Sequence, residues 1–561
     1  MAEPGLRGLA SNFELSWGLG FRALGIIALY YVCKFFIRLY QVRTNIRKIS
    51  EKHGVAMLPH SFLWGHLPIV GALTASQPPE LVSHTVPLLI MEKYPEFCTK
   101  GFIYLDVWPF GTPMIAVFHP GLAEQVTQER SSAPKADFMK EAFKPITGCN
   151  DLVNMEGRTW KTWRAAFNPG FSLRNILSLV PAMAEEAQIF KKALEDQARS
   201  GKTIPLEEQI TGLTVDIIGQ AVLGTRLNVQ TETESVLTRT IKKQINMILF
   251  DRAPASIIKA IYPLRPFLMR YYNYVIKREL FPHIERQMRE HQSQEYRKGP
   301  KTINHLAIEA YIKETSSDGS ASQGKLDANF LDIAVSQLKI FLLAGYETTA
   351  STLCFAYYLL HRNPDVAARL REEHDAVLGT DASLATSRIV EDPSLLQRLP
   401  YTSAVLKETL RLYPPIGSAR QGSPKIVLTH PDTGERLPTD GFFVFVCSHA
   451  SHRWERLWPR PLEVIPERWL TQDEKDPLHP VKGAFRPFEL GPRNCIGQEL
   501  AQVEMRFVLA LTARELEIIP QYPENAPEAF GEKAYQSLKG EHIAASPKDG
   551  LPAKVVLRKS G

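Results

Sequence analysis

Residues 488–497 read Phe488-Glu489-Leu490-Gly491-Pro492-Arg493-Asn494-Cys495-Ile496-Gly497, and this stretch decides the fold of the chain. The cysteine lies between two glycines, and an amphipathic run, 498–511, follows at once. The pattern predicts a loop that places a thiolate at the N-terminus of a helix. Unpaired backbone N–H groups and the helix dipole favour the anion there, so we expect a lowered pKa for the thiol. Gly491 lets the loop fold back, and Gly497 lets another group approach the backbone closely.

Two interpretations of Cys495 stay open at this point. A soft thiolate held in this way suits an iron centre, and haem iron is a recognised partner of a single cysteine. A buried structural cysteine at the start of a helix explains the same ten residues equally well. The rest of the chain has to decide between them.

Composition excludes several classes of protein. The chain has 561 residues, of which 44% are apolar and 22% charged, which is ordinary for a globular protein with a large core. The net charge of +6 is spread along the chain, so nucleic acid binding is not indicated. Six cysteines lie far apart without a CxxC pair, which argues against a disulfide framework, a zinc knuckle and covalent haem attachment. The main body is therefore expected in a reducing compartment.

The N-terminus contains a candidate membrane anchor. Residues 15–37 are apolar apart from two basic residues and a serine, and as a helix they extend about 35 Å, enough for a hydrocarbon core of about 30 Å. Six basic residues between 34 and 52 face a single acidic one, which places the downstream body in the cytosol. We expect a tail (1–14), a transmembrane anchor (15–37), a basic linker (38–54) and a catalytic body (55–561). An interfacial helix and a cleaved signal peptide remain alternatives.

The body is predicted to be mainly α-helical with small β-sheets. Two short strand-like runs lie in 103–107 and 113–117, helical patterns dominate 122–355, and strand signals return at 425–428, 442–447 and 553–557. A polar segment, 315–324, is expected to be a loop. One large helical domain fits this distribution better than several small ones.

The predicted helix 331–360 carries polar residues in an apolar setting. Glu347 and Thr348 follow an all-apolar centre, where a carboxylate is costly without a partner. Thr348 can bond to the carbonyl one turn back and open a place for water. Gly345, beside the small Ala344, would leave room for a flat ligand. A packing glycine with a capped polar pair is the structural alternative.

Two further pairs suggest buried charge recognition. Glu408 and Arg411 lie one helical turn apart, and Arg468 in a later Pro-Glu-Arg-Trp stretch could complete a carboxylate–guanidinium triad. Trp160 and Arg164 share a helical face and could grip a carboxylate together. Each pair alone is more simply explained as a surface ion pair or an aromatic packed under an arginine.

Taken in this order, the motifs resemble the cytochrome P450 family of haem-thiolate monooxygenases. The resemblance extends over about residues 55–561, and its final ten-residue signature is the most specific part. The matching elements are WxxxR (Trp160, Arg164), AGxETT (344–349), ExxR (Glu408, Arg411), PERW (466–469) and FxxGxRxCxG (488–497). One residue departs from the family pattern: Glu489 replaces the usual glycine after the phenylalanine.

The resemblance implies a role for each matching residue. Cys495 would be the axial ligand of a haem b iron, with Phe488 beside it and Gly491 and Gly497 shaping the loop. Glu347 and Thr348 would relay protons on the distal side. The residues implied to hold the haem propionates are Arg493, Trp160, Arg164 and Arg420, and those implied to form a structural triad behind the haem are Glu408, Arg411 and Arg468.

The resemblance also implies a reaction and partners. The chain would use O2, with NADPH electrons from a separate reductase and cytochrome b5 as an optional second donor, to hydroxylate, epoxidise or similarly oxidise an apolar small molecule. An endoplasmic reticulum membrane and a filamentous-fungal secondary-metabolite pathway are expected. The alternatives are a reductase-free isomerase or dehydratase, a fatty-acid or xenobiotic hydroxylase, and a binding protein without catalysis. The basic residues expected to steer an acidic partner are Arg158, Lys161, Arg453, Arg456, Arg460, Lys482 and Arg486.

Substrate identity cannot be deduced from these motifs. The segments expected to line the substrate pocket are the loop before Trp160, residues 226–265, residues 341–344 and the stretch near His542.

Overall fold

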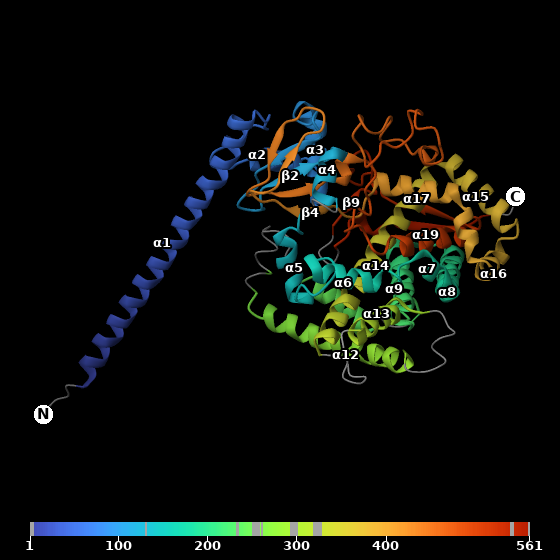
Figure 1. Ribbon diagram of the computed structural model, residues 1–561, viewed down its shortest axis with the longest axis horizontal. Coiled ribbons are helices and arrows are strands. Elements are labelled where there is room, and N and C mark those ends of the chain that lie inside the picture. Colours follow the sequence, from blue (N-terminus) through green and yellow to red (C-terminus); the bar gives the residue numbers. More distant parts are fainter. Residues whose placement is uncertain are drawn as a thin grey trace.

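The protein forms a large helical body from which one long helix extends (Figure 1). The computed structural model describes residues 5–128, 132–231, 235–248, 259, 262–291, 301–317, 328–538 and 543–558. Within these ranges it describes the side chains of all residues except 5–21, 291, 313–317, 328 and 329. The fold is mainly α-helical with small sheets, as predicted. His542 and residues 318–324 of the predicted polar loop lie outside the described residues, whereas residues 315–317 of that loop are helical, at the end of the helix Ile303–Ser317.

Helix α1 (Gly5–His53) joins the predicted anchor to the body without interruption. Its segment from Arg22 has the length and apolar character needed to cross a membrane, with a mean hydropathy of 1.6. The predicted linker, 38–54, is helical up to His53. Its side chains Leu39, Val42, Arg43, Ile46 and Ile49 are buried, and their spacing of three and four residues makes one helical stripe.

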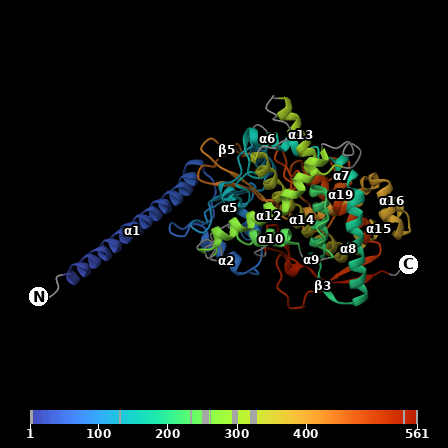
Figure 2. The same ribbon diagram turned by 90° about the horizontal axis from the view of Figure 1, so that it is seen from below.

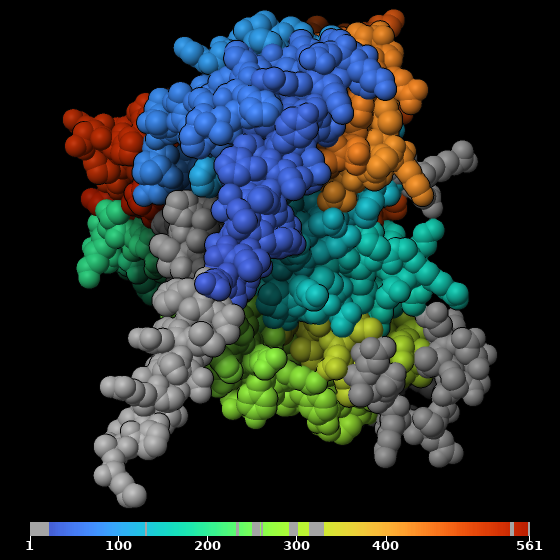
Figure 3. Space-filling view, turned by 90° about the vertical axis from the view of Figure 1, so that its left-hand side faces the viewer, coloured from blue at the N-terminus to red at the C-terminus, as the bar shows by residue number. Residues whose placement is uncertain are grey.

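The N-terminal part of the body is built on a four-stranded sheet in the order β1-β2-β7-β4. Its first two strands are the predicted pair, and they run antiparallel with Phe102 opposite Val117. Strand β2 is parallel to β7, so residues more than 300 positions apart become neighbours. Blue N-terminal and orange later residues accordingly adjoin on the face shown in Figure 3. The strands are β1 (Phe102–Leu105), β2 (Met114–Val117), β7 (Phe443–Val446) and β4 (Ser418–Gln421).

Three smaller sheets lie elsewhere. A three-stranded sheet has the order β3-β11-β8, and two hairpins pair β5 with β6 and β9 with β10. The strands are β3 (Thr203–Pro205), β5 (Val427–Thr429), β6 (Arg436–Pro438), β8 (Leu516–Pro520), β9 (Gln536–Ser537), β10 (Ser546–Pro547) and β11 (Pro552–Leu557).

Helix α14 (Ala328–Arg362) crosses the centre of the body and includes the predicted helix 331–360. It packs against α9 (Leu206–Leu223), α17 (Pro400–Leu412) and α5 (Asp137–Thr147), because apolar residues surround its middle. At Gly345 an added Cβ would lie 2.9 Å from Cγ1 of Ile218. The glycine therefore allows α14 and α9 to approach, and the expected room for a flat ligand is not on the Gly345 side.

The remaining described helices complete the body, and α12, α15 and α19 among them also contact α14. Figure 2 shows α10 and α12 side by side on the face seen from below. These helices are α2 (Leu67–Ala75), α3 (Val86–Lys93), α4 (Pro120–Thr127), α6 (Gly157–Phe167), α7 (Leu173–Ser178), α8 (Val180–Ser200), α10 (Val236–Ile245), α12 (Arg265–His291), α13 (Ile303–Ser317), α15 (Pro364–Leu378), α16 (Ala385–Glu391), α18 (Ser448–Ser451) and α19 (Gln498–Thr512). Short 3-10 helices include η5 (Pro393–Arg398) and η6 (Pro466–Trp469).

Candidate haem-binding site

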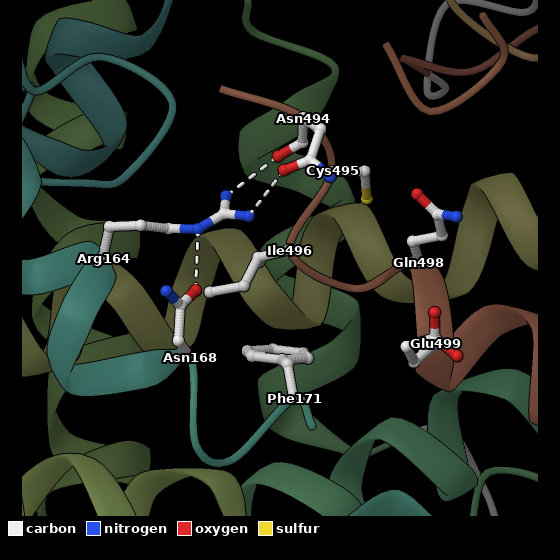
Figure 4. A pocket seen from close by; sticks show the side chains of 8 residues that line it. All are labelled: Arg164, Asn168, Phe171, Asn494, Cys495, Ile496, Gln498 and Glu499. Carbon is white, nitrogen blue, oxygen red and sulfur yellow. Dashed lines mark hydrogen bonds between the residues drawn. The ribbon is translucent and has the colours of Figure 1, made fainter. Parts of the chain in front are cut away.

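The cysteine loop leads directly into helix α19, as predicted. The backbone N–H of Cys495 donates to the carbonyl of Phe488 at 2.8 Å, which closes the loop on itself. The thiol points into a cavity of about 260 Å³ (Figure 4). The lining residues are Arg164, Asn168, Phe171, Asn494, Cys495, Ile496, Gln498 and Glu499.

The expected lowering of the Cys495 pKa is wrong for the thiol alone. Although the residue is exposed at the cavity, desolvation of the sulfur by the surrounding protein raises its pKa, and the N–H of Gly497 and the cations Arg164 and Lys135 oppose that effect without reversing it. The helix N-terminus acts in the predicted direction but is the smaller influence. A positive metal ion would add the missing stabilisation of the thiolate.

The two glycines of the loop have different reasons to be glycine. Gly491 has a φ of 82°, and an added Cβ would lie 2.2 Å from the carbonyl oxygen of Thr127. At Gly497 an added Cβ would find only Cys495 Sγ and a ring carbon of Phe171, both at 3.9 Å. Gly491 is therefore required by the fold, whereas the space beside Gly497 is open to another group.

The structure ties Arg164 to the cysteine loop. Its Nη1 donates to the carbonyl of Asn494 at 2.8 Å, its Nη2 to the side-chain oxygen of the same residue at 2.9 Å, and its Nε to Asn168 at 2.9 Å (Figure 4). Burial lowers the pKa of Arg164, and the Cys495 sulfur acts against this. The guanidinium thus supports the loop that carries the thiol.

Arg493 and Trp160 form a second contact between the loop and α6. The guanidinium lies 4.7 Å from the Trp160 ring centroid, a cation–π arrangement. It also pairs with Glu156 at 2.6 Å and donates to the carbonyls of Val153 and Met155. Arg493 therefore already has protein partners in addition to any propionate.

Arg420 supplies the clearest sign that an anion belongs here. The side chain is fully buried on β4. Its Nε and Nη2 have no hydrogen-bond acceptor among the residues that the structure describes, and Nη1 makes only a long bond to the Ala133 carbonyl at 3.4 Å. Burial lowers its pKa to about 10. Two unpaired nitrogens of a buried cation are costly. They fit a haem propionate, and the Cys495 thiol fits its iron.

Lys135 is a nearby cation that the sequence analysis missed. The backbone of Lys135 pairs with that of Arg420 in a β-bridge, and the backbone N–H of Lys135 donates to the Glu156 carboxylate at 2.8 Å. Burial lowers its pKa to about 7, with further lowering by Arg420 and Arg493. No local motif marks Lys135, because it reaches the site only through pairing with β4, nearly 300 residues later.

On α14 the structure separates the predicted acid and alcohol. Thr348 donates to the carbonyl of Ala344 at 3.0 Å, the bond one turn back that was predicted, and both residues lie on the more open side of the helix. Glu347 is buried and accepts bonds from the backbone N–H groups of Ile543 at 2.8 Å and Ala544 at 3.1 Å, and from the Tyr346 hydroxyl. Its carboxylate thus faces the C-terminal segment.

The structure brings the three residues of the predicted triad together. Glu408 accepts bonds from Arg411 Nη2 at 2.8 Å and Nε at 2.9 Å, and from Arg468 Nε at 3.3 Å, and all three side chains are fully buried. The Trp469 indole and the Ile465 backbone N–H complete the set of donors to the carboxylate.

His452 connects this triad to the cysteine loop and was not anticipated. Its Nδ1 donates to the Arg411 carbonyl at 3.1 Å, and its Nε2 accepts the backbone N–H of Arg486 at 3.0 Å. Its own carbonyl accepts from the Arg411 guanidinium at 2.9 Å. Burial lowers the pKa of His452 to about 3, so the ring is neutral.

The cluster of His119, His430 and Asp432 resembles a metal site by proximity alone. His430 uses Nε2 towards the Lys100 carbonyl and Nδ1 as acceptor for the N–H groups of Asp432 and Thr433. His119 likewise accepts the Gly121 N–H on Nδ1. The ring nitrogens are committed to protein groups, so we do not assign a metal there.

Not all the basic residues expected to steer a partner are available at the surface. Arg486 is buried and paired with Glu489, and Arg453 is half-buried. Arg456 and Arg460 are exposed but pair with Asp432 and Glu463. The exposed cations that remain from the predicted set are Arg158, Lys161 and Lys482.

Comparison with known proteins decides the family. The cytochrome P450 family model matches residues 87–540. The chain belongs to the cytochrome P450 family. This P450 is 36% identical to cytochrome P450 monooxygenase polC of Polytolypa hystricis, over 95% of each chain. It is 34% identical to cytochrome P450 monooxygenase acrF of Aspergillus aculeatus, over 80% of this chain and 93% of that protein.

The crystal structure of a cytochrome P450, CYP102L1, has the same fold as this P450, with a TM-score of 0.68 at 20% identity over 90% of this chain and 99% of that one. The resemblance inferred from the sequence motifs is therefore confirmed, and this P450 is an oxidoreductase. The family implies a haem bound through a cysteine thiolate, and Cys495 and Arg420 provide a fitting thiol and anion site.

Proposed function

We propose that this P450 is a membrane-anchored haem monooxygenase that inserts one atom of O2 into an apolar small molecule, by hydroxylation, epoxidation or a related oxidation. The observation that carries the proposal is the Cys495 thiol at an open cavity, in the same body as a buried Arg420 with two unpaired nitrogens. The names of the polC and acrF relatives, both cytochrome P450 monooxygenases of fungi, support the reaction, and a role in secondary metabolism is part of the proposal.

The residues of the chain would divide the work of holding the cofactor. When bound, the haem supplies O2 activation, which an axial thiolate favours by pushing electron density towards the bond to be cleaved. Cys495 would bind the iron and Arg420 a propionate, with Trp160, Arg164 and Arg493 supporting the same end of the site. The buried triad of Glu408, Arg411 and Arg468 would hold the protein behind the haem rigid.

Proton delivery would depend on Thr348 and Glu347. The Thr348 hydroxyl donates to the Ala344 carbonyl, so its oxygen is left to accept a hydrogen bond from water and to hold that water near the reacting oxygen. The Glu347 carboxylate accepts hydrogen bonds from the N–H groups of Ile543 and Ala544. To pass a proton to Thr348 it would have to turn away from these two groups.

The substrate is proposed to be apolar because the part of α14 that would contact it carries apolar side chains. Ala344 is exposed on α14, and the neighbouring Leu343, Leu342 and Phe341 are apolar. Phe341 packs against Phe167 and Phe171, so Ala344 is the best candidate for direct contact within the predicted segment 341–344. A pocket of this character binds substrates mainly by burial of apolar surface.

Electrons are proposed to come from NADPH through a separate reductase, with cytochrome b5 as an optional donor. Three exposed cations, Arg158, Lys161 and Lys482, would steer an acidic partner. Reversing these charges should slow reduction at low ionic strength and have little effect at high salt. Reduction rates that ignore both changes would overturn the steering role.

The membrane is proposed to be that of the endoplasmic reticulum, with the body in the cytosol. Helix α1 supplies the anchor, and Phe62, Leu63 and Trp64 form an exposed apolar loop beside its C-terminal part. Protease added to sealed microsomes should digest the body and spare the anchor. Protection of the body would contradict this orientation.

The alternative reactions are tested by cofactor dependence. A ferrous-CO spectrum typical of thiolate ligation in the purified wild-type protein, and the loss of that spectrum in Cys495→Ala, would support the haem assignment. A wild-type protein without such a spectrum would favour a binding protein without catalysis. Product that requires NADPH, reductase and O2 supports the monooxygenase. Product formed from a peroxide without reductase would instead show the isomerase or dehydratase. Panels of polyketides, terpenoids, fatty acids and xenobiotics, read by substrate-induced spectral shifts, would define the substrate class.

A further inference from the structure

Glu489 occupies a backbone position that favours glycine. Its φ is 57°, in the left-handed region, which side chains with a Cβ rarely adopt. The residue lies between Phe488, whose carbonyl closes the cysteine loop, and Leu490, whose N–H donates to the Glu489 carboxylate at 3.0 Å. A strained carboxylate at this point suggests that the side chain itself has a use.

The carboxylate neutralises a buried arginine. Glu489 Oε1 accepts a hydrogen bond from Arg486 Nε at 2.7 Å and lies at the same distance from Arg486 Nη2 in an ion pair. The Arg486 side chain is only 2% exposed. Arg486 also donates to the Thr127 hydroxyl at 2.7 Å. Without Glu489 the guanidinium would be a buried cation with no counter-ion.

Arg486 and Glu489 belong to a larger cluster of charges beside the cysteine loop. Glu489 acts on two further cations, since it raises the pKa values of Arg420 and Lys135 against the effect of burial. Arg493 pairs with Glu156, which also accepts the Lys135 backbone N–H. The cluster therefore consists of four basic groups, Lys135, Arg420, Arg486 and Arg493, and two carboxylates, Glu156 and Glu489.

At neutral pH the three arginines are charged and Lys135, with a pKa of about 7, is about half protonated, so this cluster has an excess of one to two positive charges. A haem brings two propionates, which offset this excess and favour protonation of Lys135. Removing the Glu489 carboxylate would leave one uncompensated positive charge near the haem. Positive charge in a poorly solvated site favours the ferrous state, which has one positive charge less than the ferric state.

We propose that Glu489 is a positioning residue that sets the charge balance at the propionate end of the site, and that it thereby keeps the haem reduction potential lower than a neutral residue would. The inference rests on the proposed haem assignment. It assigns a use to the one residue of the cysteine loop that departs from the family pattern.

Reduction potentials of four holoenzyme variants test this role. Glu489→Gln should shift the potential to more positive values, and Arg486→Gln should shift it to more negative ones. The double variant should return close to the wild-type potential, because it removes both charges. Glu474→Gln, an exposed carboxylate in a different loop, is the matched control and should leave the potential unchanged.

Glu489→Gly guards against misfolding, because glycine accepts a φ of 57° without strain. It should give the same positive shift as Glu489→Gln. Potentials that do not follow the sign of the charge removed would overturn the proposal, as would loss of haem from both Glu489 variants, which would show a purely structural role. A wild-type protein that binds no haem through a thiolate would instead overturn the proposed function on which the inference rests.

Discussion

Thr348 is the residue whose chemistry is most directly open to test. Its hydroxyl lies on the open side of α14 and bonds to the Ala344 carbonyl. In Thr348→Ala we expect NADPH consumption to continue while product per NADPH falls about ten-fold or more, with peroxide released instead, because general acid–base groups contribute about 10²–10⁴ to a rate. Parallel assays of NADPH, product and peroxide measure this coupling.

Thr348→Ser is the matched control, since it keeps the hydroxyl and loses only a methyl group. It should retain most of the coupling. Unchanged coupling in Thr348→Ala would mean that the hydroxyl does not take part in proton delivery.

His452 predicts a pH dependence of stability. Burial lowers the pKa of the folded ring from 6.5 to about 3. Below pH 6.5 the unfolded chain takes up a proton that the folded protein excludes, because Nε2 already accepts the Arg486 N–H. Stability supplied by the neutral ring is therefore complete above pH 6.5 and is lost as the pH falls towards 3.

Urea unfolding at a series of pH values measures this effect. His452→Gln keeps one donor and one acceptor but cannot be protonated, so its unfolding free energy should fall less steeply with pH, by about 1.4 kcal/mol per pH unit. His66 and His374, which are buried, and His84, which is partly buried, also have lowered pKa values and will keep some dependence in the variant. If the unfolding free energies of the wild-type protein and His452→Gln fell equally steeply with pH, His452 would not contribute to the pH dependence of stability.

Among the elements, the contact between α17 and η6 depends on one carboxylate. In Glu408→Gln the guanidinium groups of Arg411 and Arg468 stay fully buried without their counter-ion. We expect a loss of about 3–5 kcal/mol in the free energy of unfolding and weaker haem retention. Denaturant unfolding and haem content measure both quantities.

Glu463→Gln is the control for that change. Its carboxylate is 57% exposed and pairs with exposed Arg460, so we expect a loss of about 0–1 kcal/mol. Similar losses in the two variants would show that the buried triad is no more important than a surface pair.

Elements whose geometry is local could be predicted from the sequence. The course of the cysteine loop into a helix is visible in its own glycines and the run that follows, although Arg164 and Thr127 also constrain the loop. The ion pair of Glu408 and Arg411 needs only one helical turn. Lys135 and His452 could not be found, because their partners lie on distant strands and loops. The direction of the Glu347 carboxylate was likewise missed, since the amides that attract it are nearly 200 residues away.

At the scale of the whole molecule, α1 is more than a tether, because its C-terminal part packs into the core of the body. Deleting residues 1–37 should release the protein from membranes and leave the fold intact. Deleting residues 1–53 also removes Leu39, Val42, Ile46 and Ile49 from the core and leaves buried Asp106 without its partner Arg43. Since a buried aliphatic side chain contributes about 1.5–3 kcal/mol, we expect this form to unfold at a clearly lower temperature or not to fold.

Membrane pelleting and thermal unfolding of the two truncated forms check this expectation. Equal stabilities would show that residues 38–53 are dispensable to the body.

The mainly helical class and the small sheets were predicted, because hydrophobic periodicity reports on each element alone. The parallel pairing of β2 with β7 was not, because pattern alone does not say which distant strands meet.

The unbroken course of α1 sets a rotational phase between the proposed anchor and the body. Each residue of an α-helix turns the chain by about 100°. One alanine inserted between Ile37 and Arg38 would therefore turn the body by that angle relative to the anchor, and would move the exposed Phe62-Leu63-Trp64 loop off the side it now occupies. Seven inserted residues would restore the phase to within about 20°. The angular register of α1 thus fixes which face of the proposed anchor points the same way as this loop.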